Sequence, residues 1–341
     1  MAKESGSVVA AARAFLTSPQ PPRAVRLAFA SALALSFGFF TLAQFDSASR
    51  HSDFGMVWFG ARALIEGVDP WSAVGPHLAF DYDWRLIYPG TALVAMLPLT
   101  PFSERVATAL FIGISTWLLA FGITKDGWYR VPIFASLAFI SAARLGQWSI
   151  LFTAAVFLPA LAFFSVAKPQ AAIPVLAAAR TRTAFIAALA GFAILTVSSL
   201  LLDPGWPARW LAAARASSYM DPAITYFPGV LVLAVLSKWR RPEAWIILSL
   251  AVVPQSWGWY NTLILFTIPA SFAEAVILCA TTLLGAWFAD NHVNASTPDG
   301  LMEAMGRTIN VTVYLPATIF VLRRKNVGPT PAWLKPFVKR Y

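Results

Sequence analysis

The stretch LAFASALALSFGFFTLAQF, residues 27 to 45, contains 19 residues without a charge and decides the class of fold. A run of about 20 apolar residues is long enough for a helix to cross the hydrocarbon core of a membrane. The run is too long for a typical signal-peptide core and no convincing cleavage site follows it, so we interpret it as a retained membrane helix. A cytoplasmic N-terminal segment, residues 1–26, is predicted by the basic residues that precede the run, which are Lys3, Arg13, Arg23 and Arg26.

The composition of the whole chain agrees with a membrane protein. Of the 341 residues, 58% are hydrophobic, 14% are aromatic and 12% are charged, whereas a soluble domain carries roughly 25% charged residues. The formal net charge of +10 does not by itself indicate a nucleic-acid partner, because membrane proteins collect Lys and Arg in cytoplasmic loops. We therefore predict one integral-membrane domain over residues 1–341, an all-α polytopic helical bundle with short interfacial helices in its extracytoplasmic loops, and no nucleic-acid partner.

The longest polar stretch, residues 46–85, is predicted to be the first extracytoplasmic loop. It holds six acidic residues against three basic ones. An acidic loop that follows a basic N-terminal segment fits the side of the membrane away from the cytoplasm. The tail, residues 323–341, is rich in Lys and Arg and is predicted to be cytoplasmic.

The remaining apolar runs predict roughly 10 to 12 membrane helices, at about 20 residues for each span. Residues 86–103 and 106–124 are separated by Glu104 and Arg105, and we expect them to form a helical hairpin that turns on the cytoplasmic side. Residues 131–179 contain three uncharged pieces of unequal length. These pieces predict either three crossings, or one crossing with broken or re-entrant segments of the kind that line a cavity.

A second break is expected within residues 244–273, which carry no charge. The segment PQSWGWYN interrupts them, so we expect two helices that meet at an aromatic turn. Trp257, Tyr260 and Asn261 gather there. An aromatic belt at the membrane interface would explain the tryptophan, whereas Asn261 is polar at the break and is a candidate for binding.

The segment SDFGMVWFGARALIEGVDPW, residues 52–71, predicts a short helix that lies in the membrane interface. Ser52 or Asp53 can cap it, Arg62 and Glu66 are spaced to pair along it, and the chain then turns at Asp69. Asp53 has two candidate roles, as a helix cap or as a carboxylate aimed at a cavity at the bilayer edge. A partly desolvated carboxylate has a raised pKa and makes a useful general base.

Lys168 stands inside an apolar region, in SVAKPQAAIP. A lysine within a membrane region is costly and is a candidate for function. It either lines a cavity as a phosphate-binding cation or lies at a helix end with its ammonium reaching water. Gln147 is also polar in an apolar setting, so it needs partners and is expected to face the same cavity.

We predict no cofactor and no metal site. Cys279 is the only cysteine, which excludes an intrachain disulfide and a cysteine-based metal site, and the three histidines lack metal-binding spacing. Asp81 and Asp83 flank Tyr82 and could share a divalent cation. Paired acids in a loop are more often solvated, so this alternative has little support.

Four segments, in order DFGMVWFGARALIEGVDPW, YPGTALVAMLPL, GQWSILFTAAVF and AKPQAAIPVL, resemble glycosyltransferase family 87. These are GT-C-type membrane enzymes that use polyprenyl-phosphate sugars, and members are similar to mycobacterial polyprenyl-phosphate-mannose-dependent α-mannosyltransferases. The resemblance covers roughly residues 27 to 270 and rests on the order and spacing of the segments. The chain departs from the family at Gly90, where members often have a second proline after the Tyr-Pro pair, and after Trp257, where some members have histidine.

The resemblance implies a GT-C-like bundle in the bacterial inner (plasma) membrane, with the active site on the extracytoplasmic face. It implies a hexosyltransferase that moves a sugar, mannose being the commonest in the family, from a polyprenyl-phosphate donor to a hydroxyl of a lipid or glycan acceptor. Asp53 would be the catalytic base. The expected substrate-binding residues are Arg62, Tyr88, Gln147, Lys168, Trp257, Tyr260 and Asn261.

In this interpretation a cation stabilises the charge of the leaving phosphate. Lys168, Arg62 and Arg209 are the candidates. A transporter or flippase of lipid-linked sugars is the alternative, because a polar cavity and broken helices would suit it equally. The clustering of acids in one loop and the lack of an internal sequence repeat favour the enzyme.

Overall fold

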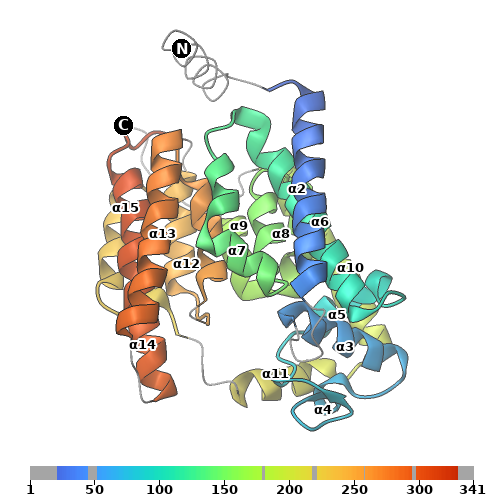
Figure 1. Cartoon of the computed structure of the whole chain (residues 1–341). Helices are drawn as coiled ribbons and strands as arrows, with labels where there is room; N and C mark the ends of the chain where they lie inside the picture. Colours follow the sequence, from blue (N-terminus) through green and yellow to red (C-terminus); the bar gives the residue numbers. More distant parts are fainter. Residues whose placement is uncertain are drawn as a thin grey trace, which may run out of the picture.

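The computed structural model describes residues 21–44, 52–178, 181–216, 221–256, 258–293 and 297–328. These segments are mostly helical (Figure 1), and the described strands form one parallel pair, β1 (Val74–Gly75) with β2 (Phe80–Asp81). The predicted N-terminal segment and basic tail lie mainly outside the described residues.

Five stretches of the described chain are long and apolar enough to cross a membrane. They are α2 (Arg23–Gln44), α6 (Glu104–Ile123) with the following turn η2 (Thr124–Asp126), α10 (Arg182–Leu202), α13 (Phe272–His292), and residues 300–322, which join α14 (Pro298–Ile309), the π-helical η8 (Asn310–Tyr314) and α15 (Leu315–Leu322).

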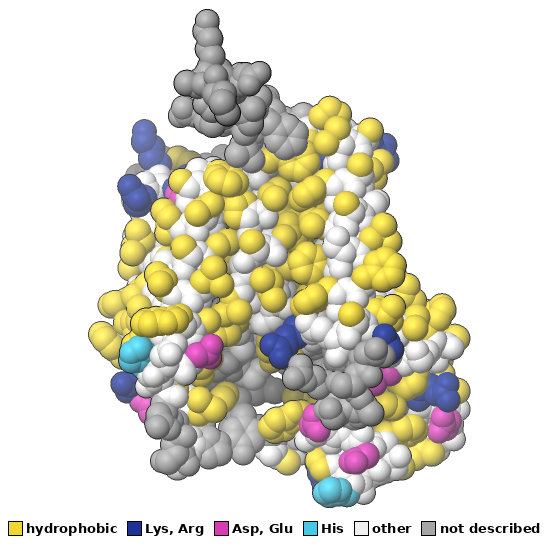
Figure 2. All heavy atoms as spheres, in the orientation of Figure 1, with side chains coloured by type: hydrophobic (Ala, Val, Ile, Leu, Met, Phe, Trp, Pro, Cys, Tyr) yellow, Lys and Arg dark blue, Asp and Glu magenta, His cyan; other side chains and the backbone are white. Residues whose placement is uncertain are grey.

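Two of these helices present apolar side chains outward along most of their length. Phe39 of α2 is 67% exposed and Leu201 of α10 is 80% exposed. Hydrophobic side chains cover the middle of the face drawn in Figure 2, and charged side chains gather towards its two ends. A large exposed apolar surface marks a site of contact with a membrane or another protein, and together with the five membrane-length helices it agrees with the prediction of a membrane protein.

The other helices are short. They are α3 (Asp53–Ile65), α4 (Pro70–Ala73), α5 (Gly90–Met96), η1 (Leu97–Leu99), η3 (Val131–Ala135), α7 (Leu137–Arg144), α8 (Ser149–Ala155), η4 (Pro159–Ala167), α9 (Pro169–Ala178), α11 (Trp206–Ala216), η5 (Ala223–Thr225), η6 (Gly229–Lys238), α12 (Pro242–Val252) and η7 (Trp259–Thr267).

Both predicted breaks are present. Within the predicted segment 131–179, residues 131–178 are described and form the short pieces from η3 to α9, so the broken arrangement is the one adopted. Proline begins η4 and α9, where it removes a backbone donor and interrupts a continuous helix. The segment 244–273 is likewise divided between α12 and η7. Full-length helices in the described chain are fewer than the 10 to 12 expected, because many apolar runs are divided in this way.

The expected hairpin at Glu104 and Arg105 is wrong. Arg105 Nε donates a hydrogen bond to the carbonyl oxygen of Leu42 at 2.7 Å, and Ser52 Oγ lies 3.4 Å from Glu104 Oε1. The turn therefore lies at the same end of the bundle as the first loop, not at the opposite end. The physical reason is that residues 86–103 form the seven-residue α5 and the proline-containing η1, which are too short for a crossing.

The two ends of the bundle differ. The start of α2 and the end of α15 lie at one end, and α3, α4 and α11 lie at the other (Figure 1). At the first end, Arg324 pairs with Glu243 at 3.1 Å and with Glu274 at 2.7 Å. The second end carries the candidate site.

Candidate functional site

Ser52, rather than Asp53, caps helix α3. The Ser52 side chain accepts a hydrogen bond from the backbone amide of Gly55 at 2.9 Å, and its backbone is extended as a cap requires. Asp53 is the first helical residue, and its backbone amide donates to Leu145 at 2.8 Å. Asp53 is therefore not the helix cap, and its carboxylate is available for other contacts.

A tight turn at Gly146 brings Gln147 next to the start of α3. Gly146 has φ +66°, a left-handed conformation that favours glycine. A Cβ atom at this position would lie 2.9 Å from Phe54 Cβ and 3.2 Å from Ser52 Cβ. Glycine is thus required both for the turn and for the close approach of α3.

Aromatic packing fixes the same approach. The Phe54 and Phe111 rings stack with their centroids 4.8 Å apart, and the Phe111 and Trp148 centroids are 5.2 Å apart. Phe54 follows Asp53 and Trp148 follows Gln147, so the buried rings hold these two polar residues beside each other. Aromatic contacts of this kind contribute roughly 0.5–1.5 kcal/mol each beyond their burial.

The buried amide of Gln147 joins a carboxylate to an ammonium group. Gln147 Nε2 donates a hydrogen bond to Asp53 Oδ2, and Gln147 Oε1 accepts one from Lys168 Nζ at 3.1 Å. Lys168 Nζ also donates to the hydroxyl of Tyr88 at 3.3 Å. Four of the predicted site residues, Asp53, Gln147, Lys168 and Tyr88, are therefore connected side chain to side chain.

Lys168 is held where two short helices meet. It lies between η4 and α9, and its carbonyl oxygen accepts hydrogen bonds from the backbone amides that begin α9. Its ammonium lies 5.4 Å from the ring centroid of Tyr88 and 5.9 Å from that of Tyr260, within the range of cation–π attraction. The ammonium thus points to the site residues, and reaching away to water is not the role that this geometry fits.

Burial raises the pKa of the Asp53 carboxyl above its ordinary value. The positive charge of Lys168 and the hydrogen bond from Gln147 act in the opposite direction, and the effect of burial is larger. Asp53 is outside the five membrane-length helices. A carboxylate with a raised pKa is a stronger base than an exposed aspartate, as a proton acceptor near neutral pH requires.

Tyr82 and the break before η7 complete the surroundings of the cluster. The Tyr82 hydroxyl donates to the carbonyl oxygen of Ser52. On the other side, the Tyr260 and Ser256 hydroxyls are 3.0 Å apart, and Asn261 Nδ2 donates to the Ser256 carbonyl at 2.6 Å. Trp257 lies outside the described residues.

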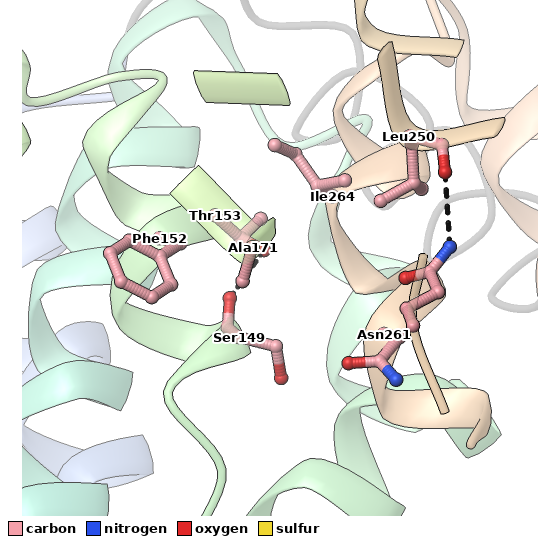
Figure 3. A pocket seen from close by; sticks show the side chains of 8 residues that line it. Ser149, Phe152, Thr153, Ala171, Leu250, Asn261 and Ile264 are labelled. Carbon is pink, nitrogen blue, oxygen red and sulfur yellow. Dashed lines mark hydrogen bonds between the residues drawn. The ribbon is translucent and has the colours of Figure 1, made fainter. Parts of the chain in front are cut away.

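A small recess is lined in part by Ser149, Ala171 and Asn261, which lie close in sequence to Gln147, Lys168 and Tyr260 (Figure 3). Side chains of α8 and α9 face those of α12, η7 and the segment between these two across it. None of them is charged; they are Ser149, Phe152, Thr153, Ala171, Leu250, Gln255, Asn261 and Ile264. The buried hydroxyl of Ser149 has no hydrogen-bond partner among the described residues. Its free space is about that of one water molecule, so without movement of its walls it can take a single small polar group such as one hydroxyl.

Arg62 and Arg209 do not join the cluster. Arg62 pairs with Glu66 at 3.3 Å on the exposed face of α3, as their spacing predicted. Arg209 pairs with Asp69 at 3.0 Å and also with Asp203. Of the three cations considered for the leaving phosphate, Lys168 is the one that the structure places beside Asp53 and Gln147.

The loop acids hold the backbone. Asp69 caps α4 by accepting from the amide of Trp71 at 3.3 Å, and Asp81 accepts from the amide of His77 at 2.7 Å. Across the described segments there is no group of three or more His, Cys, Asp or Glu residues arranged to hold a metal ion.

No protein-family model, curated protein or solved structure matches this chain. The resemblance to glycosyltransferase family 87 therefore rests on the sequence segments alone.

Proposed function

We propose that this chain is a membrane glycosyltransferase. It transfers a sugar, expected to be mannose, from a polyprenyl-phosphate donor to a hydroxyl of a lipid or glycan acceptor at the extracytoplasmic face of the bacterial inner (plasma) membrane. The observation that carries the proposal is the connection of the Asp53 carboxylate to the Lys168 ammonium through one buried amide. A base and a cation held this close can serve the two ends of one displacement reaction.

Asp53 acts on the attacking group. Its carboxylate accepts the proton of the acceptor hydroxyl as the oxygen forms a bond to the anomeric carbon of the sugar. The amide of Gln147 donates to the same carboxylate and fixes its orientation. A positioned general base of this kind contributes roughly 10²- to 10⁴-fold to a rate.

Lys168 acts on the leaving group. The bond from the anomeric carbon to the phosphate oxygen breaks, the electron pair leaves with that oxygen, and the phosphate gains negative charge. The ammonium, held by Gln147 and Tyr88, stabilises this charge as it develops. Attack and departure on opposite faces of the sugar invert the anomeric configuration.

The recess beside Asn261 supports the same proposal. A sugar joined to a phosphate at Lys168 has to lie within a few ångströms of the ammonium. Asn261 follows Tyr260, whose ring lies beside that ammonium, and the recess lining is uncharged. The recess has room for about one water molecule, so it can take one hydroxyl of the transferred sugar.

A transporter or flippase of lipid-linked sugars is the second candidate. The interrupted helices from η3 to α9, and from α12 to η7, are the observation that favours it, because broken helices form substrate sites in many transporters. A transporter site usually lies near the middle of the bundle. The cluster instead lies beside the acidic loop, at the end that carries α3 and α4, which favours the enzyme.

Reconstituted vesicles distinguish the two. Purified protein in proteoliposomes receives polyprenyl-phosphate mannose with a radioactive sugar, together with a membrane extract that supplies acceptors. The enzyme moves label from the donor into other lipids or glycans. Movement of intact donor across the bilayer, with all label still on polyprenyl phosphate, would instead support the transporter.

A further inference from the structure

Three tryptophans outside the cluster hold the segment that carries Tyr88. Trp210 Nε1 donates to the carbonyl oxygen of Ile87 at 2.9 Å, and Trp71 Nε1 donates to that of Tyr88 at 3.3 Å. The Trp206 ring covers Gly90, where a Cβ atom would lie only 2.8 Å from ring atom Cδ2. The peptide groups on both sides of the Tyr88 Cα atom are therefore fixed by indole groups.

The tryptophans form one unit. The Trp71 and Trp206 rings are stacked, with centroids 6.4 Å apart, and the Trp206 and Trp210 centroids are 5.9 Å apart. Arg209 of α11 pairs with Asp69, the cap of α4. That ion pair is partly exposed and stabilises little by itself, but it joins α11 to α4 in the register that stacks the rings.

The segment around Tyr88, residues 87–91, supports Lys168 through two hydrogen bonds. The Tyr88 hydroxyl accepts from Lys168 Nζ at 3.3 Å. Thr91, one residue after Gly90, donates from its hydroxyl to the carbonyl oxygen of Val166 at 2.8 Å, and Val166 stands two residues before Lys168. A shift of the segment would move both the side-chain partner of the ammonium and the backbone that supports it.

We propose that Trp206 and Gly90 are a positioning pair that sets the place of the Lys168 ammonium through Tyr88 and Thr91. Neither residue touches the reacting groups. Gly90 is small because the Trp206 ring occupies the space where a side chain would lie, which gives a structural reason for glycine after the Tyr-Pro pair. As a statement about catalysis, the inference rests on the proposed sugar transfer.

The test uses Gly90→Ala, Trp206→Leu and the double variant, in full-length protein in detergent or membranes. The first readout is the rate at which limiting acetic anhydride acetylates Lys168, measured by mass spectrometry against other lysines of the same sample. The second readout is kcat and KM for mannose transfer. Gly38→Ala is the matched control, because an added Cβ there meets nothing closer than 3.6 Å, and Trp84→Leu removes a tryptophan that is 63% exposed.

Each single variant is expected to change the Lys168 acetylation rate several-fold and to lower kcat by about 10- to 100-fold, the size of effect that a small misplacement of a reacting group produces. KM changes less. The double variant is expected to be no worse than the stronger single variant, because both act through one contact. Trp206→Phe, which keeps a stacked ring, is expected to restore much of the loss.

Unchanged Lys168 acetylation in folded Gly90→Ala and Trp206→Leu would overturn the inference. If Gly90→Ala does not fold, Trp206→Leu and Trp206→Phe show whether the Lys168 acetylation rate depends on the ring at position 206. The acetylation readout needs no sugar transfer. If wild type transfers no sugar but the Lys168 acetylation rate still changes in the variants as expected, the proposed function is contradicted and the positioning pair is supported.

Discussion

The side-chain amide oxygen of Gln147 lies 3.1 Å from Nζ of Lys168. The nitrogen of the same amide donates to Asp53, so one neutral group orients both a carboxylate and an ammonium group. Gln147→Ala removes both contacts and is expected to lower kcat by about 10- to 100-fold, because neither group is then held in place. Steady-state transfer rates measure this. Asn291→Ala, which alters an exposed amide on α13, is the control, and a normal rate in Gln147→Ala would refute a role for the amide.

Lys168→Met is expected to lower kcat by about 10²- to 10³-fold, the usual effect of removing one stabilising group from a developing negative charge. Lys168→Arg is expected to recover only part of the rate, because the planar guanidinium needs more room between Gln147 and Tyr88 than an ammonium does. Single-turnover kinetics report the chemical step directly. Lys125→Met changes an exposed lysine and should be normal; equal loss in both variants would mean that the effect is not local.

If Asp53 is the base as proposed, the pH dependence of kcat/KM reports on its protonation. Its pKa is raised by burial, and the base must be deprotonated, so activity is expected to fall as the pH is lowered through that raised pKa. The positive charge of Lys168 lowers the pKa of Asp53; in Lys168→Met this influence is lost, and the acidic limb should move to higher pH. The residual activity of Lys168→Met, measured across a pH series, tests the direction of this shift. A shift of the limb to lower pH would contradict the pairing of the two groups.

Gly146→Ala is expected to destabilise the protein and to reduce activity. A left-handed conformation costs a residue with a Cβ atom roughly 1–2 kcal/mol, and here the Cβ also meets Phe54 at 2.9 Å. Gly67→Ala separates the two costs, because Gly67 has φ +70° but nothing within 4 Å of its Cβ position. Thermal unfolding in detergent should therefore show a larger loss of Tm for Gly146→Ala than for Gly67→Ala. Equal losses of Tm would show that contact between the added Cβ and α3 does not destabilise the protein.

Ser149→Ala tests the recess. The buried Ser149 hydroxyl has no partner among the residues described, so its removal is expected to leave Tm unchanged or slightly higher. A hydrogen bond to a sugar hydroxyl is worth about 0.5–1.5 kcal/mol, so KM for polyprenyl-phosphate mannose is expected to rise about 2- to 10-fold. Ser141→Ala, whose hydroxyl already donates to Ala138, is the control. An unchanged KM would remove Ser149 from the sugar site.

Much of the fold follows from hydropathy. The long uncharged run at residues 27–45 predicted the helix that became α2, because an apolar stretch of membrane length has few other stable forms. The same rule failed at residues 86–103. Those residues are apolar, but Pro98 and Pro101 interrupt them, and the hydropathy of a segment does not reveal where its chain reverses.

The site was predictable to the extent that polar residues stood out from apolar surroundings. Asp53, Gln147 and Lys168 were recognised in that way, and the resemblance to family 87 added Tyr88. Arg62 was also expected at the site, but its pairing with Glu66 on the exposed face of α3 keeps it elsewhere.

The residues that sequence reasoning missed act through tertiary contacts. Trp206 and Gly90 are far apart in the sequence, and no local pattern indicates that an indole ring lies over that glycine. The departure at Gly90 from the Tyr-Pro-Pro pattern was the one signal of it.

The most direct measurement is transfer of labelled mannose from polyprenyl-phosphate mannose in membranes that hold wild type, Asp53→Asn or Asp83→Asn at equal abundance and with equal Tm. Asn at position 53 can still accept from Gln147 but cannot take a proton, and Asp83 is an exposed acid in the same loop. Wild type and Asp83→Asn are expected to transfer mannose, and Asp53→Asn is expected to be slower by about 10²-fold or more. Equal transfer by Asp53→Asn would contradict the assignment of the base, and no transfer by wild type would contradict the mannosyltransferase itself.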